Sequence, residues 1–379
     1  MIIFLNISKL AVYLIVIMSK INTLQSIRCF AILGVITSHC DLGGFGAFSV
    51  SLFIILSGFV MFYNYQTRKI NTGIIPSLKF TIGKIKKLYP LHLLTMTLIL
   101  LLALNQLIKH FSSSSLISLI FKTFSNILLI QDWFPKISIY FSLNGVAWYL
   151  SLCLFLYYIF PTILIMLRQY SFIQAVNTIG LLFLIQITIS FSLKYILVTS
   201  SLFDNFILWF TYILPITRAL DFVIGCCTCI IFCKAKDYFR QERTFMNSIV
   251  YTAFEIVVII IGIYVYQYFY IERKTIFGSE SFVYTTIYTP CSVLLIFLFA
   301  INKGLLSTIL TNKLTIWIGD LSAYLFLIHF PVTTFYNIVT SKLDLKLSYL
   351  IKFVIIMTVS ILLSIAYKKL EYKFLKYKN

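Results

Sequence analysis

The feature that most constrains this chain is a series of apolar runs of about twenty residues, the length that an α-helix needs to cross a bilayer. The 379 residues are 60% hydrophobic and only 11% charged, whereas soluble domains are about 45–50% apolar and about 25% charged. The sequence therefore predicts an all-α fold, a polytopic bundle of membrane helices. It excludes a disordered chain, a coiled coil and a disulfide-rich secreted scaffold.

Ten membrane-spanning helices are predicted, and the connections between them are too short for a separate soluble domain. The domain is expected to cover residues 23–371, between an apolar segment at 1–22 and a basic cytoplasmic tail at 372–379. Lys9 interrupts the first segment and no small-residue cleavage site follows, which favours an interfacial or cytoplasmic helix over a signal peptide; an eleventh span is the alternative. Residues 116–133 are expected to form a re-entrant or interfacial element. The predicted spans are 24–40, 47–65, 88–108, 145–167, 173–191, 209–233, 249–268, 285–301, 314–336 and 347–367.

The formal net charge of +19 is placed unevenly along the chain. Arg68 to Lys87 holds six basic residues, Lys234 to Arg243 holds four, and Lys368 to Lys378 holds five, while the alternate connections carry fewer for their length. Basic residues accumulate in cytoplasmic loops, so we expect a multi-pass protein of the cell (inner or plasma) membrane with both termini in the cytoplasm. This placement points to anionic membrane lipids as partners rather than nucleic acid.

The eight cysteines lie within the predicted spans. A structural metal site needs a second cluster or histidine partners at ligand spacing, and the sequence supplies neither. We interpret the cysteines as small packing residues and expect no metal cofactor.

Two ionisable residues on the first predicted span stand out, because charged groups inside a membrane cost free energy and often mark functional sites. Arg28 and His39 are eleven residues apart. At about 100° and 1.5 Å per residue they share one helix face, about 16 Å apart along the axis. The alternative is that Arg28 anchors the cytoplasmic end of the helix and His39 lies at the opposite interface.

A second basic pair, Lys84 and Lys87, stands at the beginning of the third predicted span. Residues three apart share a helix face, and cations at a helix N-terminus are unfavourable unless an anion compensates. The positive-inside rule explains that these lysines are present. Their position at the same membrane face as Arg28 favours an anion-binding role.

Six motifs occur in an order that resembles the integral-membrane acyltransferase 3 family, which includes O-acetyltransferases of bacterial surface polysaccharides. The resemblance extends from about Thr23 to Glu371. Its motifs are the Arg28 to His39 spacing, Leu-Ser-Gly-Phe59, Lys-Lys-Leu-Tyr-Pro90, the Trp148-Tyr-Leu-Ser151 segment with Tyr158 and Pro161, Arg218-Ala-Leu-Asp221, and Tyr324-Leu-Phe-Leu-Ile-His329-Phe-Pro331.

The resemblance implies an O-acyltransferase that moves an acetyl or other short acyl group from cytoplasmic acyl-CoA to a hydroxyl of a cell-surface saccharide. The family's essential arginine and histidine fall on Arg28 and His39, and its paired basic residues fall on Lys84 and Lys87. Histidine suits the role of general base, because it titrates near neutral pH and an alcohol must lose its proton to react. Arg28, Lys84 and Lys87 are then expected to bind the phosphates of acetyl-CoA, the co-substrate.

The chain departs from the family pattern at two sites. The family commonly has arginines where this chain has Lys84 and Lys87, so bidentate phosphate contacts would be replaced by point charges. Many members also have a glutamate two residues after the motif serine, where this chain has Cys153.

Four further residues are predicted to bind the acceptor: Trp148, Ser151, His329 and Asp221. Each has a structural alternative. Trp148 is a potential membrane anchor, His329 a packing histidine, and Asp221 the partner of Arg218 in an ion pair between residues three apart.

Two other functions stay open at this point: a transporter or flippase of polysaccharide precursors, and a non-catalytic family member that acts in assembly. The first would favour broken helices in matching halves, and the sequence shows no internal repeat. The acceptor also stays open between a polymeric surface saccharide and a lipid-linked glycan.

Overall fold

The computed structural model describes residues 21–43, 45–197, 202–235, 244–272 and 285–376, and these ranges contain helices and no strand. Residues 1–20 of the predicted segment at 1–22 lie outside the described residues, as does most of the basic loop after Lys234. Of the predicted tail at 372–379, residues 372–376 continue the last helix and 377–379 lie outside the described residues. A helix occupies each of the ten predicted spans within these ranges. They are α2 (Asn22–His39), α3 (Gly46–Tyr65), α5 (Tyr89–Lys109), α8 (Trp148–Leu167), α9 (Phe172–Leu197), α11 (Pro215–Ala235), α12 (Phe245–Glu272), α14 (Thr289–Ile301), α16 (Lys313–Lys342) and α17 (Tyr349–Lys376).

Within the described ranges, eight helices are long and apolar enough to cross a membrane, which confirms the predicted polytopic bundle. Helices α2 and α14 are the two not among them. Helix α14 has 13 residues. Helix α2 has 18 residues and carries Asn22, Gln25 and Arg28 in its first two turns, which lowers its apolar character.

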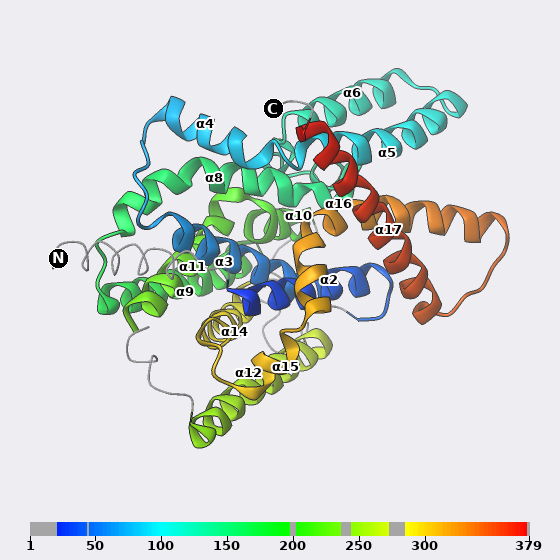
Figure 1. Ribbon diagram of the computed structural model, residues 1–379. Coiled ribbons are helices and arrows are strands. Elements are labelled where there is room, and N and C mark those ends of the chain that lie inside the picture. Colours follow the sequence, from blue (N-terminus) through cyan, green and yellow to red (C-terminus); the bar gives the residue numbers. More distant parts are fainter. Residues whose placement is uncertain (1–20, 44, 198–201, 236–243, 273–284, 377–379) are drawn as a thin grey trace.

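Short helices fill several connections. Helix α4 (Ile74–Ile85) lies in the basic loop after α3, and α6 (Ser113–Ile127) folds back along α5 (Figure 1). The segment 116–133, expected to be re-entrant or interfacial, consists of most of α6 followed by the 3₁₀ turn η1 (Gln131–Trp133). The others are α7 (Ile137–Tyr140), η2 (Gly145–Ala147), α10 (Leu202–Leu208), the π-helical turn η3 (Trp209–Ile213), η5 (Thr286–Tyr288) and α15 (Leu305–Leu310).

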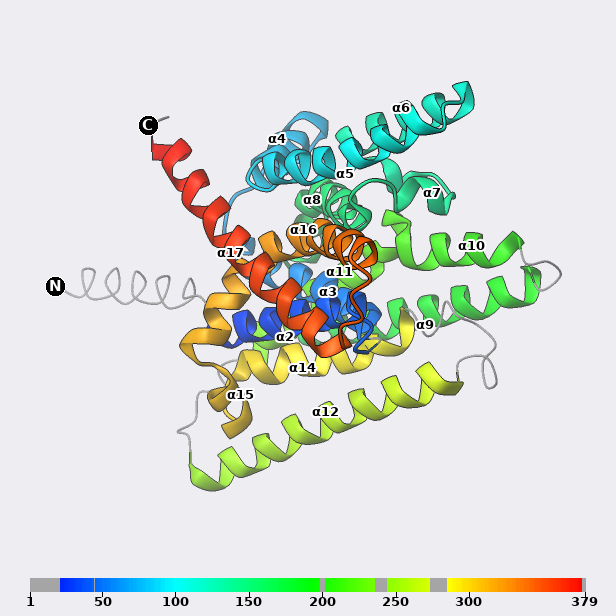
Figure 2. The same ribbon diagram turned by 90° about the vertical axis from the view of Figure 1, so that its right-hand side faces the viewer.

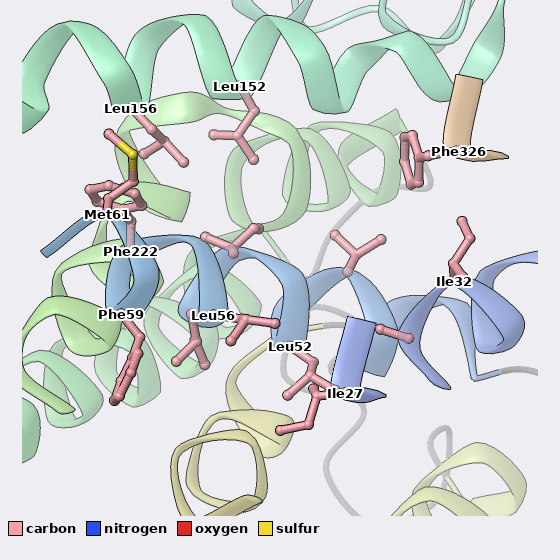
Figure 3. Packing of buried hydrophobic residues seen from close by; sticks show 14 of the residues in the cluster. Ile27, Ile32, Leu52, Leu56, Phe59, Met61, Leu152, Leu156, Phe222 and Phe326 are labelled. Carbon is pink, nitrogen blue, oxygen red and sulfur yellow. The ribbon is translucent and has the colours of Figure 1, made fainter. Parts of the chain in front are cut away.

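The helices divide into a buried centre and an outer layer. In the most apolar stretch of each helix, 61% of the residues are buried in α3 and 56% in α16, against 17% in α12 and 11% in α9. Helix α3 packs on α11, and α2 packs on both α3 and α16. Figure 3 shows Leu152 and Leu156 of α8 directed toward α3, within one continuous core of buried apolar side chains. The outer helices present apolar faces, as expected for helices surrounded by lipid.

Glycine allows the two most central helices to approach closely. A Cβ at Gly225 of α11 would meet the carbonyl oxygen of Ile55 on α3, and a Cβ at Gly58 of α3 would meet the carbonyl oxygen of Phe222 on α11. Small residues at helix contacts are typical of membrane bundles, where van der Waals packing holds helices together. Helix α3 also packs on α2, which carries the polar residues of the first predicted span.

Candidate active site

Helix α2 crosses the centre of the bundle and carries both residues of the predicted Arg28–His39 stripe. It packs against α3 on one side and α16 on the other. Both side chains are only partly exposed. Arg28 lines a cavity, whereas His39, almost three turns further along, contacts a second histidine on α16.

The cavity at Arg28 has a volume of about 180 Å³ and lies among α2, α3, α4, α8 and α16. The polar part of its lining combines two cationic side chains with hydroxyl and thiol groups. The apolar part includes the aromatic rings of Phe53 and Phe326. The polar lining residues are Arg28, Ser57, Lys84, Tyr149, Cys153, Tyr157 and Ser322. The site therefore joins positive charge to a narrow, mostly apolar interior.

The structure separates the two predicted lysines. Lys84 lines the cavity, and its Nζ lies 4.4 Å from the ring centroid of Tyr65 and 5.4 Å from that of Phe80. Cation–π contacts of this kind hold an ammonium group in place without neutralising it. Lys87 is exposed and is absent from the lining, with its Nζ 5.9 Å from the ring of Tyr324. Lys84 is therefore the lysine that shares the cavity with Arg28.

His39 and His329 form a pair. Their ring centroids are 5.2 Å apart and the ring planes are inclined by 46°. His329 is fully buried, and its Nδ1 lies 3.0 Å from the carbonyl oxygen of Leu325. A carbonyl only accepts, so Nδ1–H donates and Nε2 carries the lone pair of the neutral ring. Among the residues that the structure describes, this Nε2 has no hydrogen-bond partner, so it is able to accept a proton or a hydrogen bond from a group beside it.

A cluster of three aromatic rings lines the cavity and reaches this histidine pair through Phe326. Phe326 lies 5.1 Å from Tyr149 and 6.4 Å from Phe53, measured between ring centroids. Its ring is also 6.0 Å from that of His329. Phe53, Tyr149 and Phe326 all line the cavity. A path from Arg28 to His39 therefore passes this aromatic cluster.

Helix α8 contributes residues that the sequence reasoning missed. Tyr149, Cys153 and Tyr157 are four apart, which places them on one face of α8, and all three line the cavity. Ser57, from the Leu-Ser-Gly-Phe59 motif on α3, and Ser322, two residues before Tyr324 on α16, also line it. The four-residue spacing of Tyr149, Cys153 and Tyr157 was the sequence feature from which their shared helix face could have been predicted.

Two predicted acceptor residues, Trp148 and Ser151, are buried away from the cavity lining. The Trp148 ring is 5.1 Å from that of Tyr212. The Ser151 hydroxyl donates to the carbonyl of Leu129 at 2.7 Å. Both sets of contacts are those of packing residues, so an acceptor role for either residue stays an untested prediction.

Asp132 is a buried carboxyl group on the Ser151 side of α8. It lies in η1, outside the membrane-spanning helices, and is fully buried. Neither carboxyl oxygen has a hydrogen-bond partner among the described residues, and burial raises the pKa of the carboxyl well above the ordinary value. The indole N–H of Trp209 donates to its backbone carbonyl at 2.7 Å. This bond fixes η1 against η3.

Asp221 belongs to a buried polar network. Its Oδ2 lies 2.9 Å from Nη1 of Arg218, and its Oδ1 accepts a hydrogen bond from Nε2 of Gln186 at 2.8 Å. Arg218 also donates to Ser51 at 3.0 Å, and Thr289 donates to Asp221 at 3.3 Å. The network joins α3, α9, α11 and α14, and Asp221 does not line the Arg28 cavity. These contacts favour the structural alternative for Asp221, while its predicted role in acceptor binding stays untested.

Replacing Asp221 with Leu should destabilise the protein strongly, because it leaves the buried Arg218 charge unpaired. Breaking one side of a buried ion pair costs about 3–5 kcal/mol. The double substitution Arg218→Met/Asp221→Leu should recover part of this loss, which thermal unfolding of the purified variants measures. Equal unfolding temperatures for the wild type and Asp221→Leu would contradict the structural role.

Among the described residues, no three His, Cys, Asp or Glu side chains come together as metal ligands. The cysteines are all free, and Cys229 and Cys233 place their sulfur atoms 3.9 Å apart on α11.

Comparison with known proteins identifies one family. A model described as an acyltransferase domain, Acyl_transf_3, matches residues 21–369. No curated protein and no solved structure matches the chain. The matched residues include every helix from α2 to α16 and most of α17.

Proposed function

Because the chain belongs to the acyltransferase 3 family and is a membrane acyltransferase, we propose that it moves an acetyl or another short acyl group from acyl-CoA to a hydroxyl of a cell-surface saccharide. The observation that carries this proposal is the arrangement on α2, where Arg28 lines a cationic cavity and His39 faces His329 beyond an aromatic cluster. Helix α2 therefore carries both Arg28, at the proposed donor site, and His39, the proposed base.

The donor is proposed to bind at the cavity. Arg28 and Lys84 supply positive charge to the cavity lining. The exposed Lys87, three residues after Lys84, adds a further positive charge outside the lining. Guanidinium and ammonium groups form strong charge-assisted hydrogen bonds with phosphates. The aromatic and aliphatic lining suits the uncharged arm that carries the thioester. Positive-inside loops favour the cytoplasm as the side from which acyl-CoA enters.

The base is proposed to be His39. An unprotonated nitrogen of His39 takes the proton of the saccharide hydroxyl while its oxygen attacks the thioester carbonyl. The new C–O ester bond forms, the C–S bond breaks, and the departing CoA thiolate takes the proton from His39. The ring of His329, 5.2 Å from that of His39 between centroids, packs beside the proposed base and limits its orientation.

Lys84→Ala is expected to weaken acyl-CoA binding rather than catalysis. Loss of one charge-assisted phosphate contact, about 1.4 kcal/mol, raises the KM for acetyl-CoA roughly tenfold with little change in kcat. Steady-state kinetics with the purified enzyme measures both constants. Lys79→Ala is the matched control, because Lys79 is an exposed lysine of the same helix and does not line the cavity. Equal KM values for the two variants would show that Lys84 does not bind acetyl-CoA.

The proposed function is tested by incubating the purified protein with labelled acetyl-CoA, with and without saccharide from the host. Acceptor-dependent release of CoA and label on the saccharide support the proposal. Movement of saccharide across the membrane without thioester cleavage would favour a transporter, and the absence of both activities would favour an assembly role.

A further inference from the structure

Three cationic side chains gather around Tyr65, the last residue of α3. The guanidinium carbon of Arg68 lies 5.0 Å from the centroid of the Tyr65 ring, and Nζ of Lys84 lies 4.4 Å from the same centroid. Nη2 of Arg168 donates a hydrogen bond to the main-chain carbonyl of Arg68 at 2.6 Å. We call Tyr65, Arg68, Lys84 and Arg168 the Tyr65 cluster. Of its three cations, only Lys84 also lines the Arg28 cavity.

The Tyr65 ring is held by rings from two other helices. Its centroid is 5.3 Å from that of Phe80 on α4 and 5.8 Å from that of Phe160 on α8, and the two phenylalanine centroids are 5.7 Å apart. Helix α4 packs on α8, and Figure 2 shows both helices on the same side of α3. Tyr65 therefore presents a fixed aromatic ring to the two cations that contact it.

The charge of the Tyr65 cluster is not balanced within the protein. Among the residues that the structure describes, no carboxylate pairs with Arg68, Lys84 or Arg168. Both arginines are exposed, and an arginine has five N–H donors, so most of these donors are available to a ligand. The positive-inside rule accounts for basic residues in this loop, but it does not require arginines from two separate segments to lie together. Neighbouring cations repel one another, and an anion bound between them removes that repulsion.

The Tyr65 cluster lies on the side of the Arg28 cavity away from the aromatic cluster. On α3, Phe53 belongs to the aromatic cluster, Ser57 lines the cavity, and Tyr65 follows Ser57 by eight residues, about 12 Å along the helix. On α8, Tyr157 lines the cavity, and Arg168 follows it by eleven residues, about 16 Å, just after the helix ends. Both helices thus place the aromatic cluster, the cavity and the Tyr65 cluster in the same order.

We propose that the Tyr65 cluster binds the phosphate on the ribose of acyl-CoA through Arg68 and Arg168. Acyl-CoA carries a pyrophosphate, from which the thioester arm extends, and a separate phosphate on the ribose of its nucleotide. With the pyrophosphate at Arg28 and Lys84 and the arm directed toward the aromatic cluster, the nucleotide lies on the opposite side, where the Tyr65 cluster is. Guanidinium groups suit this role because they bind phosphate through two parallel hydrogen bonds. The inference rests on the proposed function for the identity of the donor.

The test compares acetyl-CoA with acetyl-dephospho-CoA, which lacks only the ribose phosphate. Equilibrium binding of both ligands is measured with the full-length protein in phosphatidylcholine nanodiscs. For the wild type, we expect the Kd of the dephospho compound to be at least about tenfold higher, the equivalent of 1.4 kcal/mol. In Arg68→Gln/Arg168→Gln, the Kd of acetyl-CoA should rise by the same factor and that of the dephospho compound should stay the same, so the ratio of the two Kd values falls to about one. Arg68→Lys/Arg168→Lys should keep part of the ratio, because it keeps the charges and loses the bidentate geometry.

Lys69→Gln/Lys79→Gln is the matched control. It removes two exposed positive charges from the same connection between α3 and α5, and neither lysine belongs to the Tyr65 cluster or lines the Arg28 cavity. This variant should keep the wild-type ratio. Thermal unfolding confirms that each variant is folded.

A wild-type ratio in Arg68→Gln/Arg168→Gln would overturn the inference. If that variant also unfolds at a lower temperature, the arginines instead stabilise the C-terminal ends of their helices. Anionic lipid is the other source of a phosphate group, and native mass spectrometry in phosphatidylglycerol nanodiscs distinguishes it. Loss of bound phosphatidylglycerol in the double variant, with an unchanged ratio of Kd values, would assign the cluster to lipid head groups. A wild type that binds neither ligand would refute the proposed function, whereas a wild type that binds both equally well refutes only the ribose-phosphate site.

Discussion

His39→Ala is expected to lower kcat for acyl transfer by at least about a hundredfold, since general base catalysis contributes roughly 10²–10⁴. The physical reason is that a saccharide hydroxyl attacks a thioester only as its proton is removed. The donor site lies about three helical turns away, at Arg28 of α2 and Lys84 of α4. The Kd for acetyl-CoA should therefore stay the same. Single-turnover transfer and equilibrium binding of labelled acetyl-CoA measure the two quantities separately.

His110→Ala is the control for this experiment, because His110 is an exposed histidine that does not line the Arg28 cavity. It should transfer at the wild-type rate. A folded His39→Ala protein that transfers acetyl groups at the wild-type rate would show that His39 is not the general base.

Gly225→Val should prevent the bundle from reaching its native packing. The new side chain would enter the space occupied by the carbonyl of Ile55, and Gly58 repeats the same close contact one turn away. Overpacking a core costs about 1–3 kcal/mol when side chains can move aside. Here the obstacle is main chain in the most buried helix, so α3 and α11 must separate and the cost is larger.

Gly180→Val provides the comparison, because it adds the same β-branched residue to a membrane helix in open space. Size-exclusion chromatography of the solubilised proteins and their thermal unfolding measure the effect. We expect a folded Gly180→Val protein and little or no folded Gly225→Val protein. Equal yields and unfolding temperatures would contradict the close approach of α3 and α11.

The helices of the ten predicted spans could be predicted from sequence because the apolar run that defines each one is local. The same holds for the shared face of Arg28 and His39, which follows from helix geometry. Short helices such as α4 and α15 were not predicted. Few residues make up each of them, and α4 is placed by its packing on α8 and α15 by its packing on α12, which hydropathy does not report.

The contacts between helices could not be predicted in the same way. His39 and His329 are far apart in sequence, and only the packing of α2 on α16 brings their rings together. Ser151 illustrates the opposite case: it lies in a motif, yet its hydroxyl binds Leu129 instead of facing the cavity. Tyr149 and Tyr157, which do line the cavity, escaped notice because aromatic residues are common throughout this chain.

The central claim is that a thioester bound at Arg28 and Lys84 delivers its acyl group to an acceptor at His39, on the far side of the aromatic cluster. Sealed inside-out membrane vesicles that contain the enzyme test it directly, with labelled acetyl-CoA supplied only in the external medium. The account predicts acetyl ester on saccharide in the vesicle lumen with the wild type, and none with His39→Ala. Lumenal ester that forms equally with His39→Ala, or label that is released only outside the vesicles, would contradict it.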